Sequence, residues 1–370
     1  MQSASPLIHW PDPFIELLGF VASFLAVGAV GFRLRVIAGV MGARGTKTDD
    51  HRVLHEAAWR AAALGLAGAV VSAGIFTARL PELAARHHVT VGQLLVSSPQ
   101  TGLQAALMLT ALIGFALAVG RVRFGWRLAA IGVIAGPLSG AFFGQWNRLV
   151  VPIHRLAGGM WIGTLFMLVA AGLVTVLRSA LPAERRGAVV VELVNAFSPL
   201  ALVSAGVLAA FGVITAWQHL HVLAALWTTP YGITLIVKLL MVGVVLALGA
   251  WNWRRQKPLL GSEAGAVNLR RSATTELIAA GVVLAITSIL VSLPSPKPPG
   301  AGVRNGGPPM EARPGTGPDH APSTAPPPPA SRSAGSASSG SKAGMLPVAP
   351  RSRRSTRAPR RRRRCGCKPM

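Results

Sequence analysis

Residues 154–173, HRLAGGMWIGTLFMLVAAGL, open with a histidine and an arginine and then run apolar for the length of a membrane-spanning helix. Neutral imidazole is the commonest metal ligand in proteins, and the thioether sulfur of methionine favours Cu(I). His154 begins the stretch, and Met160 and Met167 lie seven residues apart, which predicts one helical face. The pattern indicates a site for a soft metal ion at a helix mouth. For the two methionines, core packing is the favoured alternative.

Two more histidines, His219 and His221, end a later apolar stretch as H-x-H. With the orientation derived below, they lie on the same side of the membrane as His154. Three imidazoles would then converge if the two helices are neighbours. The alternative is that these residues cap helices at the interface and meet water.

A second polar cluster, DDHRVLHE at residues 49–56, lies on the opposite side. His51 and His55 are four residues apart and share a helical face. The cluster could bind an ion. The favoured interpretation is a solvated helix start, where the acidic residues complement the helix dipole.

Lys238 is the most unusual charge, because it lies inside an apolar stretch. Ionisable groups within a membrane are costly and usually face a pathway or a partner. Glu16, near the outer end of the first stretch, is a candidate partner. Glu276 lies near the inner start of the last stretch, where a structural role with Arg270 or Arg271 is favoured.

The composition requires membrane helices to position these groups. Of 370 residues, 51% are hydrophobic and 13% are charged, and the mean hydropathy is +0.49, too apolar for an ordinary soluble domain. A spanning helix needs about 20 mostly apolar residues. The fold class predicted is an all-α, polytopic bundle of about eight transmembrane helices, over residues 14–36, 54–78, 101–120, 126–144, 154–177, 197–218, 231–253 and 274–293.

The basic residues are sorted between the connections. If the N-terminus lies outside, sixteen Lys and Arg fall in the inner connections and four in the outer ones. This bias follows the positive-inside rule, so we expect a multi-pass protein of the cell (inner) membrane with both termini outside. The first helix is expected to act as its own insertion signal. More than half of the net charge of +25 lies in the C-terminal tail, and no nucleic-acid partner is predicted.

The chain divides into three predicted parts. Residues 1–150 form an N-terminal four-helix half, residues 151–296 a second four-helix half, and residues 297–370 a basic tail rich in Pro, Gly, Ser and Arg. Such a tail cannot bury enough apolar area to fold and is predicted to be disordered. Two explanations of this basic tail stay open. It results from a shifted reading frame in GC-rich DNA, or it is an arginine-rich patch that binds anionic lipid or nucleic acid.

The sequence contains no phosphate-binding loop, no nucleophile elbow and no carboxylate pair within the apolar stretches. The connections are too short for a catalytic domain. The protein is therefore predicted not to be an enzyme.

Several stretches in combination resemble the CopD/PcoD copper-resistance family of bacterial inner-membrane proteins. They are HRLAGGMWIG (154–163), AFSPLALVSAGVLAAFGVITAW (196–217), LWTTPYGITLIVKLLMVGVVLALGAWN (226–252) and RRSATTELIAAGVVLAITSILVSLPSP (270–296). The resemblance covers mainly residues 150–296.

The resemblance implies an eight-helix protein that moves copper ions across the cytoplasmic membrane, commonly alongside a periplasmic CopC-like copper-binding protein. This chain has no fused CopC-like β-domain, so such a partner would be a separate chain. By position, the residues that the resemblance marks are His154, Trp161, Phe197, Tyr231, Gly232, Lys238 and Glu276. Copper is thus predicted as the transported ion, with metal ligands among His154, His219, His221, Met160 and Met167.

Two other functions remain open on the sequence. A b-type haem electron carrier would need paired histidines on facing helices, and on the inner side only His51 and His55 could serve. A copper sensor or assembly factor would bind the ion without transport, and copper flux into proteoliposomes separates it from a permease.

Overall fold

The described part of the chain is helical throughout. A computed structural model describes residues 11–42, 48–220, 224–256 and 263–293, and it contains no strand in these ranges. All these residues belong to one compact unit. The prediction of an all-α, polytopic membrane fold is confirmed, and the predicted tail (297–370) lies outside the described residues.

The first half of the chain contains three long helical segments and two short helices. The first segment is α1 (Pro11–Gly31), the π-helical turn η1 (Phe32–Ile37) and α2 (Ala38–Gly42). It is followed by α3 (Thr48–Arg86), α4 (Val91–Ser97), α5 (Pro99–Val119), α6 (Gly125–Ala135) and two 3₁₀ turns, η2 (Ser139–Phe143) and η3 (Trp146–Arg148).

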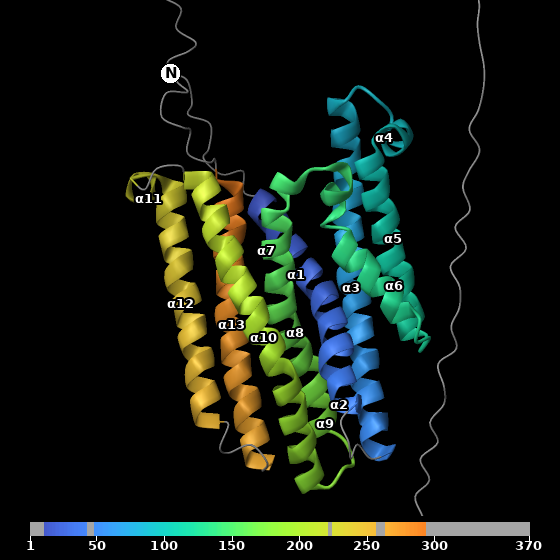
Figure 1. Cartoon of the computed structure of the whole chain (residues 1–370), viewed down its shortest axis with the longest axis vertical. Helices are drawn as coiled ribbons and strands as arrows, with labels where there is room; N and C mark the ends of the chain where they lie inside the picture. The colour runs from blue at the N-terminus through green and yellow to red at the C-terminus, as the bar shows by residue number, and fades with distance from the viewer. Residues whose placement is uncertain (1–10, 43–47, 221–223, 257–262, 294–370) are drawn as a thin grey trace, which may run out of the picture. The chain divides into compact units, whose positions relative to one another are not determined.

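The second half also begins with an irregular helix. That helix is α7 (Val150–Gly158), η4 (Gly159–Gly163), α8 (Thr164–Met167), η5 (Leu168–Leu173) and α9 (Val174–Leu177), in which η4 and η5 are π-helical. It is followed by α10 (Ala183–Leu220), α11 (Ala225–Thr228), α12 (Pro230–Gln256) and α13 (Glu263–Ser292). In Figure 1, α4 and α11 lie at one end of the bundle, and α2 and α9 at the other.

Seven helices in the described residues are long and apolar enough to cross a membrane, and the eighth predicted stretch is different. The sequence predicts a span over residues 126–144, but α6 ends at Ala135. Eleven residues of α-helix rise about 16 Å, about half of the hydrocarbon thickness. The cause is local, because Pro137 lacks the backbone N–H that would continue the helical hydrogen bonds.

The short helix α6 is held closely against α5. A Cβ added at Gly114, Gly125 or Gly132 would collide with backbone atoms of the facing helix. At the α5–α6 contact, the rings of Phe115 and Trp126 meet edge to face, 6.1 Å apart. Small residues at this contact let the two backbones approach.

The first helix lies at the centre of the core. It packs against α3 on one side and against α7, η4, α8 and α13 on the other. At the closest point, Gly28 and Gly163 face each other, and a Cβ on Gly163 would collide with the carbonyl of Phe24. Gly158, Gly159 and Gly163 allow this close packing, because a Cβ on any of them would meet Phe24 or Val27 of α1.

Thr164 carries an unpaired hydroxyl beside this contact. Its Oγ1 is buried, faces Gly31 and has no hydrogen-bond partner in the described structure. Thr164→Val replaces this hydroxyl with a methyl group at nearly constant shape. We therefore expect the free energy of unfolding in detergent to rise by about 1 kcal/mol. The measurement is the thermal unfolding midpoint of the purified protein.

Thr175→Val is the matched control for this prediction. Thr175 is also buried on the same helix, but its hydroxyl donates to the carbonyl of Ala171. The control should therefore leave stability equal or slightly lower. If Thr164→Val lost more stability than Thr175→Val, the result would contradict the conclusion that the hydroxyl of Thr164 has no hydrogen-bond partner.

Candidate metal site at His154

His154 lies in α7, which Figure 1 shows toward the α4 and α11 end of the bundle, and its ring contacts α10. Its Nδ1 is 2.9 Å from the carbonyl oxygen of Leu208. Because a carbonyl can only accept, Nδ1–H is the donor, and Nε2 keeps its lone pair. A metal-binding histidine typically donates its other ring N–H to a carbonyl or carboxylate in this way.

The fit of the ring on α10 depends on a glycine. A Cβ added at Gly212 would lie 3.1 Å from Cε1 of His154, tighter than most side-chain contacts. Gly212 stands one helical turn beyond Leu208, so the same face of α10 supplies both the acceptor and the space. The imidazole is half-buried and its orientation is fixed.

The neighbouring Arg155 belongs to a separate ion-pair cluster. Its guanidinium lies 3.7 Å from Glu16 and 4.6 Å from the ring centroid of Phe20. Glu16 also accepts from Arg79 at 2.7 Å. Glu16 is therefore bound by two arginines, and the suggested partner of Lys238 is engaged elsewhere.

Lys238 of α12 lies within electrostatic range of His154. The side chain is half-buried, and within the described ranges it forms no ion pair with a carboxylate. A cation brought to Nε2 of His154 would thus feel the repulsion of the ammonium group. The predicted role of Lys238 on a pathway stays a prediction.

The methionines and Trp161 sit further along the same helix. Met160 is half-buried with its Sδ toward Gly31 of α1, whereas Met167 is fully buried in the core. The π-helical turn η4 contains Met160 and closes i→i+5 bonds, so the regular α-helical spacing that predicts a shared face does not apply there. Trp161 packs, partly buried, against the main core.

The structure brings no three ligands together in the residues that it describes. No group of three or more His, Cys, Asp or Glu side chains is found there. His221 and the side chain of His219 lie outside the described residues. The convergence of these two histidines with His154 therefore stays a prediction.

Tyr231 and Glu276 lie in the contact between α12 and α13. Tyr231 is buried in a small cluster with Leu235 and Leu290. Glu276 points its Oε2 toward Gly249, 3.9 Å from where a Cβ would stand on that glycine. Both residues lie in the interface between these two helices.

The inner cluster contains a buried ion pair that the sequence did not indicate. Asp50 is only 1% exposed, and both its oxygens accept from Nε of Arg185, at 3.1 and 3.0 Å. Arg185 also lies 3.5 Å from Glu192. Asp49 is exposed, as the prediction of a solvated helix start requires, whereas Asp50 is buried. The sequence feature that could have indicated this ion pair is Arg185 and Arg186, at the start of a helix on the same side of the membrane.

The fold is thus that of a multi-pass helical membrane protein, in which His154 of α7 is held in one orientation by α10. Residues 191–290 match the family model described as copper resistance protein D, CopD. The predicted resemblance to the CopD/PcoD family is confirmed over this segment, which spans most of α10 and all of α12. Leu208, Gly212, Tyr231, Lys238 and Glu276 lie inside the match, whereas His154 and Trp161 precede it. Comparisons with curated proteins and with solved structures gave no match.

Proposed function

We propose that this protein moves copper ions across the cytoplasmic membrane and that His154 is a copper ligand on the path. The proposal rests on one observation. The imidazole donates Nδ1–H to Leu208, inside the CopD segment, and so presents Nε2 as a free acceptor. Imidazole nitrogen suits copper in either oxidation state.

The surroundings of the ring suit transit better than storage. Conduction requires a site that binds strongly enough to admit the ion and weakly enough to release it. A single oriented imidazole attracts copper, and the nearby ammonium of Lys238 opposes tight binding. Met160 offers a soft sulfur further along the same helix, toward α1. His219 and His221 are the proposed further ligands at the same mouth.

The proposed location is the inner membrane with the N-terminus outside. The bias of sixteen basic residues to four between the two sets of connections supports this orientation. In this orientation His154 faces the periplasm. A separate CopC-like periplasmic protein is the proposed copper donor or acceptor.

The cellular test is the copper content of cells with and without the protein. We expect cells with the protein to contain either more or less copper than cells without it. His154→Gln should remove at least about nine-tenths of this difference. Glutamine can still donate to Leu208 but offers no imidazole, so the helix contact is kept. His88→Ala, at an exposed position between α3 and α4, is the matched control and should behave as wild type. Equal copper content with and without the protein would contradict transport.

A further inference from the structure

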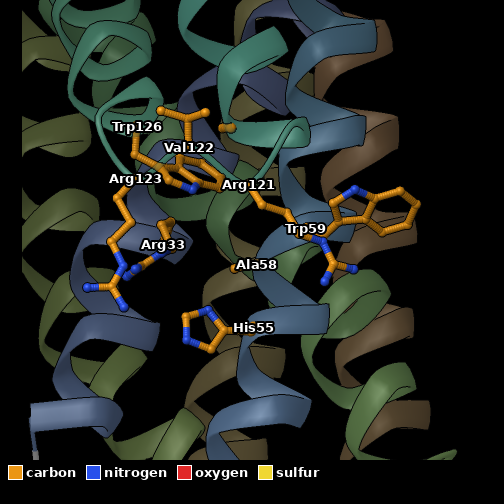
Figure 2. Close-up of a pocket in the computed structure, with 9 residues that line it drawn as sticks. Arg33, His55, Ala58, Trp59, Arg121, Val122, Arg123 and Trp126 are labelled. Atoms are coloured by element: carbon orange, nitrogen blue, oxygen red, sulfur yellow. The ribbon is translucent and has the colours of Figure 1, made fainter.

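A basic pocket lies under the α5–α6 turn. Its cavity of about 130 Å³ is lined by Arg33 of η1, His55 and Trp59 of α3, Arg121 and Arg123 of the turn, and Trp126 of α6. Figure 2 shows Arg33 and Arg123 extending on one side of the pocket, Arg121 reaching toward Trp59 on the other, and His55 between and below them. Residues from three separate segments thus gather four basic groups around one space.

The positive charges in this pocket have no carboxylate partner among the residues that the structure describes. His55 lies within electrostatic range of all three arginines, and Arg33 within that of Arg123. None of the three arginines forms an ion pair with a carboxylate of the described segments. The nearest acidic residues along α3 are used elsewhere, because Asp50 binds Arg185 and Glu56 binds Arg60 at 3.3 Å.

The backbone holds one of these arginines in a disfavoured conformation. Arg121 has φ of 63°, in the left-handed region that glycine favours. Its N–H donates to Ala118 at 3.0 Å and that of Val122 to Leu117 at 2.9 Å, the pattern that ends a helix with glycine at this position. Arginine stands at the position that glycine usually fills, and its guanidinium lines the pocket.

We propose that this pocket binds a phosphate-bearing anion. Arginine side chains bind phosphate through paired hydrogen bonds, and basic pockets between membrane helices bind lipid head groups. The cavity is about four times the volume that one water occupies in the liquid, which is room for a phosphate group. Trp59 and Trp126 add the indole rings that are enriched at the head-group level. The anion is either a phospholipid head group or free phosphate.

The same charges disfavour a copper ion in this pocket, because the three guanidinium groups near the imidazole of His55 repel a cation. The pocket lies toward the opposite side of the membrane from His154 in the proposed orientation, so anion binding there does not depend on copper transport.

The experiment compares two sources of phosphate on the purified full-length protein. In the first arm the protein is placed in nanodiscs of equal phosphatidylcholine and phosphatidylglycerol, and native mass spectrometry records which lipids stay bound. In the second arm the thermal unfolding midpoint is measured in detergent with and without inorganic phosphate at constant ionic strength. Selective retention of phosphatidylglycerol identifies the head group as the anion, and a rise of the midpoint identifies free phosphate.

Two variants and one control make the test specific. Arg121→Gly removes a guanidinium while giving the backbone its preferred residue, so it should fold at least as well as wild type and bind the anion at least about tenfold more weakly. Arg123→Gln should weaken binding similarly. Arg127→Gln removes an exposed arginine of α6 that does not line the pocket, and it should bind as wild type. No anion effect in either arm, or an effect that Arg121→Gly and Arg127→Gln reduce equally, would overturn the proposal.

Discussion

Replacing Gly163 with valine is expected to cost about 3 kcal/mol or more of stability and to lower the yield of folded protein sharply. In the native contact, a Cβ on Gly163 would overlap the carbonyl of Phe24, and Gly28 stands directly opposite. Both neighbours are backbone atoms of α1, so no side-chain rotation can relieve the overlap. The two helices must separate, and α1 is the helix around which the core is built.

The measurement is the fraction of protein that stays monodisperse in size-exclusion chromatography after heating in detergent. Gly206→Ala is the matched control, because nothing lies within 4 Å of a Cβ at this glycine of α10. It should be neutral or stabilising by up to about 1 kcal/mol, since alanine favours a helix over glycine. Equal stability of Gly163→Val and wild type would show that α1 does not approach η4 as closely as the structure has it.

Replacing Asp50 with alanine is expected to cost about 3–5 kcal/mol, since removal of one partner leaves the charge of Arg185 without its counterion. Asp50 is 1% exposed and the side chain of Arg185 is 23% exposed, so water can solvate the remaining charge only in part. Glu192, 3.5 Å from Arg185, offers a weaker alternative. The pair joins α3 to α10, and its loss should loosen the α2 and α9 end of the bundle.

The control for this prediction is the exposed pair of Glu82 and Arg86. Its side chains are 68% and 72% exposed, so Glu82→Ala should change stability by less than about 0.5 kcal/mol. The double variant Asp50→Ala with Arg185→Ala should recover part of the loss, because it leaves no unpaired buried charge. Thermal unfolding of all four proteins in one detergent checks this order. Equal effects of Asp50→Ala and Glu82→Ala would contradict the burial of the pair.

The helices could be predicted from the sequence because lipid imposes a simple rule of length and polarity. All but one of the predicted apolar stretches form helices long enough to span a membrane. The exception is α6, which ends at Ala135, directly before Gly136 and Pro137. Hydropathy alone does not reveal the end of this helix, because the residues that follow, up to Phe143, are also largely apolar.

The candidate site could be predicted only in part. His154 could be singled out from the sequence because an imidazole, a common metal ligand, begins an apolar stretch. Its acceptor, the carbonyl of Leu208, is a backbone group 54 positions away and leaves no mark in the sequence. The basic pocket was missed for a related reason, since Arg33, His55 and Arg121 each look like ordinary inner-face charges until folding gathers them.

Copper flux into proteoliposomes tests the central claim most directly. Purified wild type, His154→Gln and His88→Ala are reconstituted at equal density, and copper is measured inside the vesicles over time in both the Cu(I) and the Cu(II) form. We predict protein-dependent copper movement in wild type and His88→Ala, reduced at least about tenfold in His154→Gln. Flux no faster than in protein-free vesicles, for both forms of copper, would contradict the account.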